Sequence, residues 1–379
     1  MPPAETGMTL THLNPTVRRQ VRRFIGLPFD LYRDCPQWCP PLRRDVALAL
    51  DPERHPFYRH STAESFLAEE GGRPVGRITV MENRRFNEIR RRCDAFFYFF
   101  ETVDDPRVAA ALIGAAADWA RARGLDSLIG PKGLLPGDGL GILVEGFEHP
   151  AAMGVPYHHP YYDSLLAGCG LTKETDYLSG RLSKPYTFSP QMAEMGDAAA
   201  AALGYALHPF TSKRELRRWF GRIGEAYNRA FADNWEFCPL TPEEIKLIGD
   251  RLLALADPRM MVLLMQGDAI AGHLFIVPDL GDGLRRSRGR LLPLGWWHLL
   301  WAYRRTRGVD WFGMGLLPEH RGVGANAVMY TAIARAIDDF PYDHAELVQV
   351  EESNARMLRN MSAVGVPWQQ RHRLYRLDL

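Results

Sequence analysis

The stretch Leu316-Leu-Pro-Glu-His-Arg-Gly-Val-Gly-Ala-Asn-Ala327 joins an apolar strand to an alanine-rich helix through a glycine-rich turn. Such a turn points successive backbone N–H groups into one concavity, and the helix N-terminus adds about half a positive charge. Gly322 and Gly324 let a ligand approach the backbone closely, and Arg321 adds a full charge. The stretch predicts a pyrophosphate site, although a turn that only caps a helix could use the same residues.

The segments on both sides of this turn predict one order of elements that occurs twice: strand, strand, strand, helix, strand, helix, strand. In the first half the expected strands are 63–70, 73–82, 95–101, 125–129 and 176–182. In the second half they are 260–266, 269–277, 309–317, 344–350 and 371–377. The repeated order indicates two similar domains.

A direct alignment of the two halves supports a duplication. When Gly170 is placed on Gly365, Arg181-Leu182 falls on Arg376-Leu377 without a gap. The ends of the two halves therefore align, as expected if one domain was duplicated. The expected parts are a flexible tail at residues 1–13, a first domain at 14–184 and a second domain at 185–379.

The turn in the second half resembles the pyrophosphate loop of the Gcn5-related N-acetyltransferase superfamily, which reads Q/R-x-x-G-x-G/A. Arg321, Gly324 and Asn326 hold the three defining places, although Asn326 replaces a small residue. In that superfamily a later Asn begins a helix beside the acyl donor, and here Asn354 holds its place. Met361 stands where a Tyr would follow on that helix.

The resemblance implies an α/β (mixed α+β) fold of two tandem acetyltransferase-like domains, each a central twisted mixed sheet flanked by helices. It also implies that coenzyme A or acyl-CoA binds to the second domain as a cosubstrate, without a metal. Asn354 could bond the pantetheine arm or only cap its helix. The residues expected to hold the donor are Leu316, Leu317, Arg321, Gly322, Val323, Gly324, Ala325, Asn326 and Asn354.

The first half repeats the order of elements but lacks the residues expected to bind the acyl donor. Glu101, Asp104 and Asp105 stand at the helix entrance where the phosphate loop would lie, and carboxylates there would repel a pyrophosphate. His159 occupies the place of Asn354 in the alignment. The first domain is therefore expected to be a scaffold without a donor that helps to shape the acceptor site.

Further stretches are similar to a bacterial family of two-domain proteins that includes the bacterial ceramide synthases, which join a fatty acyl group to a sphingoid base. They are Leu27-Pro-Phe-Asp-Leu-Tyr32, Trp38-Cys-Pro-Pro-Leu42, Gly76-Arg-Ile78, Asn83, Phe99-Phe-Glu101, Gly130-Pro131, Pro160-Tyr-Tyr162, Asn228 and Asn234-Trp235. The resemblance implies transfer of an acyl group to a primary amine, with a sphingoid-type or other amphiphilic amine as one option.

Three alternatives stay open at this point. They are an acetyl-CoA-dependent acetyltransferase of a small amine or amino acid, an aminoacyl-tRNA-dependent transferase, and a non-catalytic acyl-CoA-binding module. The near-neutral formal charge of +1 argues against the second, because nucleic-acid binding needs a basic footprint.

Catalysis would need a base for the amine and a proton for the leaving thiolate. Glu346 is the first choice of base because its strand lies beside the expected donor, with Glu101 and Asp105 as alternatives. Tyr375, Tyr330 or water could supply the proton. Each carboxylate could equally be structural.

The acceptor pocket is expected between the two domains. Its candidate lining residues are His159, Tyr161, Tyr162 and Trp235. A plain turn with buried aromatic side chains would read the same way.

The segment Leu291–Trp301 combines aromatic residues with flanking arginines and follows an expected basic loop at 281–290. A helix with this pattern suits a lipid interface or the wall of an acyl channel, whereas a core helix with arginines on its wet side is the plainer interpretation.

The composition bears on the cellular compartment and on metal and disulfide sites. The 379 residues include five scattered cysteines, which predict neither a disulfide framework nor a zinc site. No signal peptide or membrane-spanning stretch is recognisable. We expect a cytoplasmic protein, with peripheral contact to the inner membrane surface as an option, no nucleic-acid partner and an undetermined oligomeric state.

Overall fold

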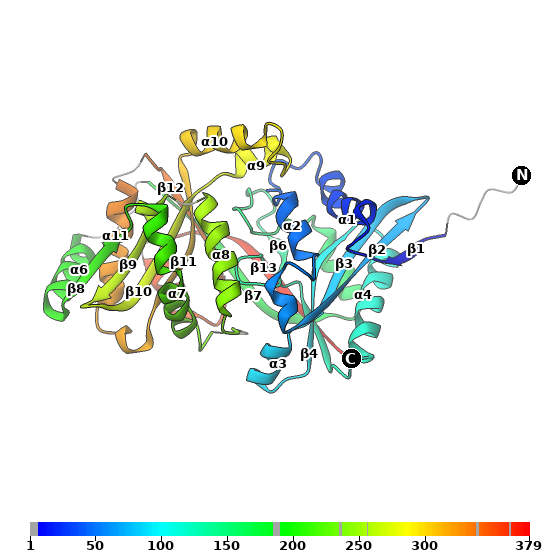
Figure 1. Ribbon diagram of the computed structural model, residues 1–379, viewed down its shortest axis with the longest axis horizontal. Coiled ribbons are helices and arrows are strands. Elements are labelled where there is room, and N and C mark those ends of the chain that lie inside the picture. Colours follow the sequence, from blue (N-terminus) through cyan, green and yellow to red (C-terminus); the bar gives the residue numbers. More distant parts are fainter. Residues whose placement is uncertain (1–6, 185–189, 235–236, 256, 339–340, 364) are drawn as a thin grey trace, which may run out of the picture. The chain divides into compact units, whose positions relative to one another are not determined.

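The computed structural model describes residues 7–184, 190–234, 237–255, 257–338, 341–363 and 365–379. The chain divides into two compact units (Figure 1). Unit 1 consists of Met1–Leu178, Gly281–Leu300 and Gln369–Leu379, and unit 2 consists of Ser179–Leu280 and Trp301–Trp368. The second half of the chain therefore contributes two segments to unit 1.

Unit 1 is a mixed sheet with the strand order β1-β2-β3-β4-β5-β13-β7, and β6 pairs with β13. Its strands are β1 (Thr9–His12), β2 (Thr62–Glu70), β3 (Arg73–Glu82), β4 (Asp94–Thr102), β5 (Ser127–Gly130), β6 (Ile142–Glu145), β7 (Thr172–Ser183) and β13 (Trp368–Asp378). Its helices are α1 (Arg18–Leu31), α2 (Arg43–Ala49), α3 (Arg84–Arg90), α4 (Pro106–Arg121), α5 (Tyr161–Gly168) and α9 (Gly281–Ser287).

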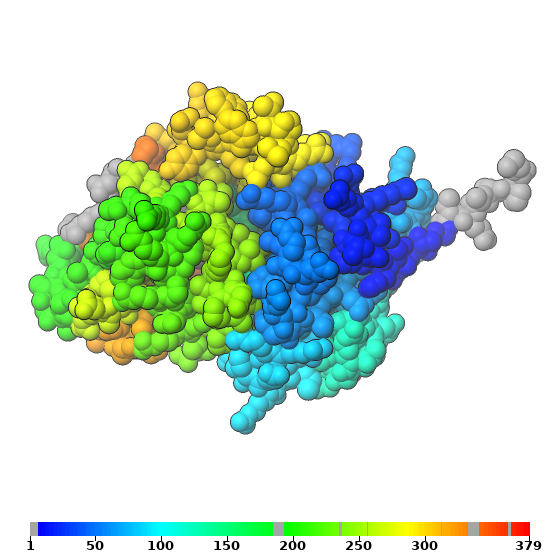
Figure 2. All heavy atoms as spheres, viewed as in Figure 1, coloured from blue at the N-terminus to red at the C-terminus, as the bar shows by residue number. Residues whose placement is uncertain are grey.

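Helix α9 corrects one prediction, because residues 281–290 were expected to be a loop. The helix buries Gly281, Gly283 and Leu284, so packing overrides the low helix propensity of its glycines. The helix α10 (Gly295–Arg305) follows, and the yellow segment that contains both helices forms part of the surface seen in Figure 2.

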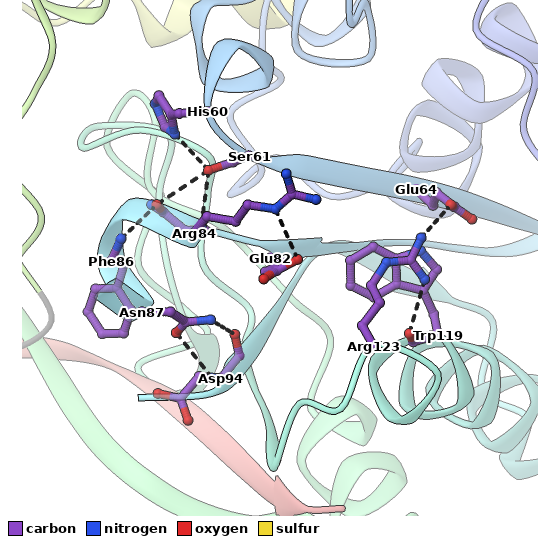
Figure 3. Close-up of polar contacts among 11 residues, drawn as sticks. His60, Ser61, Glu64, Glu82, Arg84, Phe86, Asn87, Asp94, Trp119 and Arg123 are labelled. Carbon is purple, nitrogen blue, oxygen red and sulfur yellow. Dashed lines mark hydrogen bonds and ion pairs between the residues drawn. The ribbon is translucent and has the colours of Figure 1, made fainter. Parts of the chain in front are cut away.

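Local hydrogen bonds fix where β4 begins. The Asn87 side-chain amide donates to the Asp94 carbonyl at 3.0 Å, and the Asp94 N–H donates to Asn87 Oδ1 at 3.1 Å (Figure 3). Strand β4 then runs parallel to β5 only from the pair Asp94/Ser127 to the pair Phe96/Ile129. The two strands have no paired register beyond that point among the residues described.

Unit 2 has the order β12-β11-β10-β9-β8. Its strands are β8 (Tyr205–Pro209), β9 (Met261–Gln266), β10 (Ala269–Pro278), β11 (Gly308–Leu316) and β12 (His344–Glu351). Its helices are α6 (Pro190–Leu203), α7 (Lys213–Ala230), α8 (Pro242–Leu255), α11 (Ala325–Asp338) and α12 (Ala355–Ala363). The pair β11/β12 is again parallel over a short stretch, from Gly308/His344 to Trp311/Leu347.

The structure confirms the repeat at the level of single hydrogen bonds. Gly170 and Gly365, the two residues that the alignment superimposes, both end a helix with φ 83°. Met361 matches Leu166, and both side chains are buried, which explains why an apolar residue stands at 361. The equivalent bonds run from Gly170 N to Ala167 O (2.9 Å), Gly365 N to Ser362 O (3.0 Å), Leu171 N to Leu166 O (3.2 Å) and Val366 N to Met361 O (3.0 Å).

The strands that follow these two glycines change units along their length. Strand β7 starts in unit 1, but its residues from Ser179 onward belong to unit 2. Strand β13 follows the last helix of unit 2, yet Gln369–Leu379 belong to unit 1, where Tyr375 pairs with Gly130 of β5. Each unit therefore completes its sheet with a strand segment from the other half of the chain.

No helix among the described residues has both the length and the apolarity needed to cross a membrane.

Candidate functional site

The predicted donor loop of unit 2 connects β11 to α11. A short 3-10 turn (Pro318–His320) leads into Gly322 and Gly324, whose φ values are 79° and 93°. Both angles lie in the left-handed region, which side chains with a Cβ rarely adopt. In the first turn of α11 the Ala327 N–H donates to the Gly324 carbonyl at 2.9 Å, and the preceding amides of Ala325 and Asn326 lack an intrahelical acceptor, as at any helix start. The loop thus has the form of an anion site.

Helix α6 packs along α11 beside this loop. A Cβ added to Gly324 would lie 2.9 Å from the Cβ of Ala199, and one added to Gly196 would lie 2.7 Å from Thr331 Oγ1. A Cβ added to Gly322 would meet nothing within 4 Å. Replacement of Gly324 by a residue with a Cβ is therefore disfavoured by both the Ala199 contact and the backbone conformation. At Gly322 only the backbone conformation disfavours it.

Arg321 holds the loop in place. Its guanidinium donates to the carbonyl oxygens of Ala230 at 2.7 Å and Leu316 at 3.1 Å, and it pairs with Asp233 at 3.4 Å. These contacts tie the C-terminus of α7 to the end of β11. A helix C-terminus attracts cations, which accounts for the contact with Ala230. That the Arg321 charge also binds a pyrophosphate stays a prediction.

Asn354 caps α12, because its Oδ1 accepts the N–H of Met357 at 3.1 Å. Tyr330, an alternative proton donor, is buried against the same helix, and its hydroxyl accepts from the Asn360 amide at 3.4 Å. Burial raises the pKa of Tyr330. The cap is thus observed, and a bond from Asn354 to a donor stays a prediction.

Glu346, the first choice of base, lies on β12 and forms an ion pair with Arg181 of β7. Burial raises the pKa of the Glu346 carboxyl, and the Arg181 charge and hydrogen bond oppose that rise. The net effect is a raised pKa, so burial outweighs the arginine. The role of Glu346 as the base stays a prediction.

Glu101, the alternative base, lies at the centre of a buried cluster in unit 1. Its Oε2 accepts the hydroxyls of Tyr32 at 2.6 Å and Tyr162 at 2.8 Å, and the buried Arg77 lies 3.9 Å from Oε1. Burial raises the pKa of Glu101, while Arg77 and the two hydroxyls oppose the rise. Burial also raises the pKa values of Tyr32 and Tyr162, with Glu101 the next cause.

Two adjacent tyrosines cover the end of β4 beyond the point where β4 and β5 stop pairing. The Thr102 N–H donates to the Tyr162 hydroxyl at 3.1 Å, and the Tyr161 hydroxyl donates to the Thr102 carbonyl at 2.9 Å. Both backbone groups of Thr102 are thus bonded to tyrosine hydroxyls in unit 1. The repeat places Met357 where Tyr162 stands.

The other predicted site residues in unit 1 are also engaged. The His159 ring stacks on Tyr161 at 5.5 Å, and the Tyr375 hydroxyl donates to Asp163 of α5. Asp105 caps α4 by accepting the Arg107 N–H at 2.8 Å, and its hydrogen bonds to Arg107 lower the pKa of its carboxyl. The structure thus brings Glu101, Tyr161, Tyr162 and His159 together, while Trp235 lies outside the described residues.

Three buried residues were not predicted as site residues: Tyr32 and Arg77, which contact Glu101, and His273, which lies on β10 of unit 2. Tyr32 and Arg77 lie within quoted family stretches, so their motifs could have indicated them. His273 on β10 is buried, and neither ring nitrogen has a hydrogen-bond partner among the residues described. Its ring lies against Gly315 of β11, where an added Cβ would be 3.0 Å from Nε2. Burial lowers the pKa of His273 to about 4.

No protein-family model matches the chain. Among curated proteins, Protein YghO of Escherichia coli is 28% identical over 97% of this chain and 95% of its own length. The bacterial ceramide synthase of Caulobacter vibrioides is 28% identical over 99% of both chains. A tandem GNAT protein from the clavulanic acid biosynthesis pathway has a similar structure, with a TM-score of 0.59 over 98% of both chains and 14% identity.

The two parallel strand pairs, the matched helix ends and these similarities agree on one fold. The chain has the tandem fold of the Gcn5-related N-acetyltransferases and is related over its full length to a bacterial ceramide synthase.

Proposed function

We propose that the protein is an acyl-CoA-dependent N-acyltransferase that binds its donor on unit 2 and transfers the acyl group to a primary amine. In this reaction the amine nitrogen attacks the thioester carbonyl, a C–N bond forms, the C–S bond breaks, and the amine loses a proton as the thiolate leaves. The relative's name supports a fatty acyl donor and a sphingoid-type or other amphiphilic amine.

The observation that carries the proposal is the difference between the two equivalent loops. In unit 2, Gly322 and Gly324 bend the backbone ahead of α11, and no carboxylate stands between Arg321 and Val328. In unit 1, Asp105 caps the corresponding helix and Tyr162 occupies the Thr102 amide. A pyrophosphate would therefore meet the backbone amides of a glycine turn at one helix and a carboxylate at the other.

The residues of unit 2 divide the work as follows. The loop amides bind phosphate oxygens, Arg321 keeps the loop against β11, and Asn354 fixes the start of α12 beside it. Glu346 is the proton acceptor after release from Arg181, and Tyr330 or water protonates the thiolate. A metal has no part in this scheme.

The test compares Gly322→Glu with Gly322→Ala. Both variants carry the same backbone strain at φ 79°, and space is open at that position, so they differ in charge. Calorimetry with coenzyme A should show at least about tenfold weaker binding for the Glu variant than for the Ala variant, equivalent to about 1.4 kcal/mol. Equal affinities in two folded variants would remove the donor from this loop.

Turnover decides between an enzyme and a binding module. Release of free thiol from acetyl-CoA and from long-chain acyl-CoA is followed with a sphingoid base and with small polar amines. We expect the highest kcat/KM for a long-chain donor with an amphiphilic amine, because each buried methylene contributes about 0.8 kcal/mol. Best turnover with acetyl-CoA and a small amine would support the acetyltransferase alternative. Binding without turnover for any amine would support an acyl-CoA-binding module.

A further inference from the structure

Four large apolar side chains in residues 292–297 face solvent. The exposed fractions are 77% for Leu292, 66% for Leu294, 50% for Trp296 and 54% for Trp297. We call these four residues the Leu-Trp surface. Single exposed apolar residues are ordinary, but four in one short segment indicate a surface that a membrane or another molecule covers.

The backbone holds the Leu-Trp surface in one shape. The Trp296 N–H donates to the Leu291 carbonyl at 2.9 Å, and the Trp297 N–H donates to the Leu294 carbonyl at 3.1 Å. A Cβ added to Gly295 would overlap the Arg290 carbonyl oxygen, so the turn closes tightly on itself. The exposed side chains are therefore presented by an ordered turn.

The base of this turn is fixed to α1 and α2 within unit 1. The Arg43 N–H donates to the Gly289 carbonyl at 2.9 Å, and Arg43 Nε donates to the Arg288 carbonyl at 3.1 Å. The Arg288 guanidinium in turn donates to the Phe29 carbonyl at 3.2 Å. Figure 2 shows the yellow segment that contains the turn at the surface of the molecule.

Along the chain, the charged residues next to the Leu-Trp surface are all arginines. Arg286 and Arg290 are exposed just before it, and the last turn of α10 carries Arg304 and Arg305. No Asp or Glu occurs between Arg286 and Arg305. Apolar and aromatic side chains with flanking arginines match the boundary between acyl chains and anionic headgroups.

We infer that the Leu-Trp surface docks on an anionic lipid membrane. Leu292 and Leu294 enter the acyl boundary, Trp296 and Trp297 lie at headgroup level, and Arg290 contacts lipid phosphate. A second copy of the chain fits less well, because a symmetric contact would bring the Arg290 side chains together without a carboxylate from this segment. The inference uses no step of the proposed reaction.

The test is co-sedimentation of the full chain with vesicles of phosphatidylcholine alone or with added phosphatidylglycerol. We expect at least tenfold stronger partitioning to the anionic vesicles and a fall in binding as salt rises. The double variant Trp296→Gln/Trp297→Gln should lose at least tenfold in partitioning. Ile89→Gln, which changes an exposed apolar residue of α3 (50% exposed), should bind as the wild type does.

Two further variants separate the contributions. Leu292→Ser should weaken binding to both kinds of vesicle, and Arg290→Glu should abolish the preference for anionic vesicles. The oligomeric state of each variant is measured by sedimentation equilibrium. Wild-type protein that binds neither vesicle overturns the inference, and a dimer that the Trp double variant disrupts assigns the surface to a second copy. Vesicle binding does not depend on turnover, so its failure leaves the proposed reaction intact.

Discussion

Tyr162 shows how a residue predicted to touch substrate can belong to the core. Its side chain has no exposed surface, and its hydroxyl both donates to Glu101 and accepts the Thr102 N–H. The sequence predicted that it lines an acceptor pocket, because it belongs to a cluster of histidines and tyrosines beside a helix start. Tyr162 is buried because it packs on the end of β4, at Glu101 and Thr102, which is distant from it in the sequence.

Tyr162→Phe is expected to lower the free energy of unfolding by about 1–3 kcal/mol, since it leaves a buried carboxylate and a buried amide each short of one partner. Urea unfolding measures the change. Tyr161→Phe, in which a partly exposed hydroxyl loses one bond to a carbonyl, should lose less. If Tyr162→Phe leaves the free energy of unfolding unchanged, neither bond contributes to stability.

His273 leads to a prediction about acid stability. Its pKa is about 4 in the folded protein and near the ordinary 6.5 when unfolded, so protonation favours unfolding. Its stabilising contribution is complete above pH 6.5 and is lost as the pH falls towards 4. In His273→Met that loss is absent.

Unfolding free energies of wild type and His273→Met at pH 7 and pH 4.5 give the size of the effect. We expect the difference between the two proteins to change by on the order of 1–3 kcal/mol in favour of the variant at the lower pH. Taking the difference removes the contributions of other buried histidines. Parallel pH profiles would mean that His273 has the same pKa in the folded and the unfolded protein.

At the scale of elements, the packing of α6 on α11 supports the donor loop. Gly196→Ala places a Cβ within 2.9 Å of the Ala327 carbonyl oxygen, so the helices must separate. Thermal unfolding should show a loss of about 1–3 kcal/mol, and coenzyme A binding should weaken with it.

A matched control for that change lies in α7. A Cβ at Gly221 would meet nothing within 4 Å, so Gly221→Ala should stabilise by about 0.5–1 kcal/mol through helix propensity alone. Opposite signs for the two substitutions are the expected result. Stabilisation by both would mean that α6 does not press on α11.

Sequence patterns predicted elements well where periodicity was strong and packing was ordinary. The third strand of each half was expected at 95–101 and 309–317, and the structure has β4 and β11 there. The next helix of the first half starts at Pro106 as expected, whereas that of the second half was expected from Gly322 and starts at Ala325. Helix α9 was missed because Gly281 and Gly283 read as loop residues. The partners of Arg321 could not be predicted, because the Ala230 carbonyl reaches it only after α7 has packed on the sheet.

At the scale of the whole molecule, the predicted halves differ from the compact units, because Gly281–Leu300 and Gln369–Leu379 of the second half belong to unit 1. The alignment of Gly170 with Gly365 identified the duplicated segments, and the hydrogen bonds agree with it. It could not show that β13 enters the sheet of unit 1, because β7 and β13 hold equivalent places in the alignment and either could pair with β5. The division at residues 184 and 185 therefore remains a prediction about duplicated segments.

A fragment of residues 1–184 is expected not to fold by itself, because the place beside β5 would be empty. Circular dichroism and limited proteolysis should show an unfolded or protease-sensitive chain. Addition of a peptide of residues 366–379 should restore resistance to proteolysis, and a peptide of the same composition in scrambled order should not. A fragment that folds cooperatively without the peptide would mean that β13 is dispensable for unit 1.

The shared strand also orders the events of biosynthesis. A nascent chain exposes β5 of unit 1 long before residues 369–379 have been translated, and an unpaired strand edge is prone to aggregation. Unit 1 therefore waits on the ribosome with an open sheet while all of unit 2 is made. We therefore expect a chaperone that recognises open strand edges to bind the nascent chain early and to leave once β13 has paired with β5.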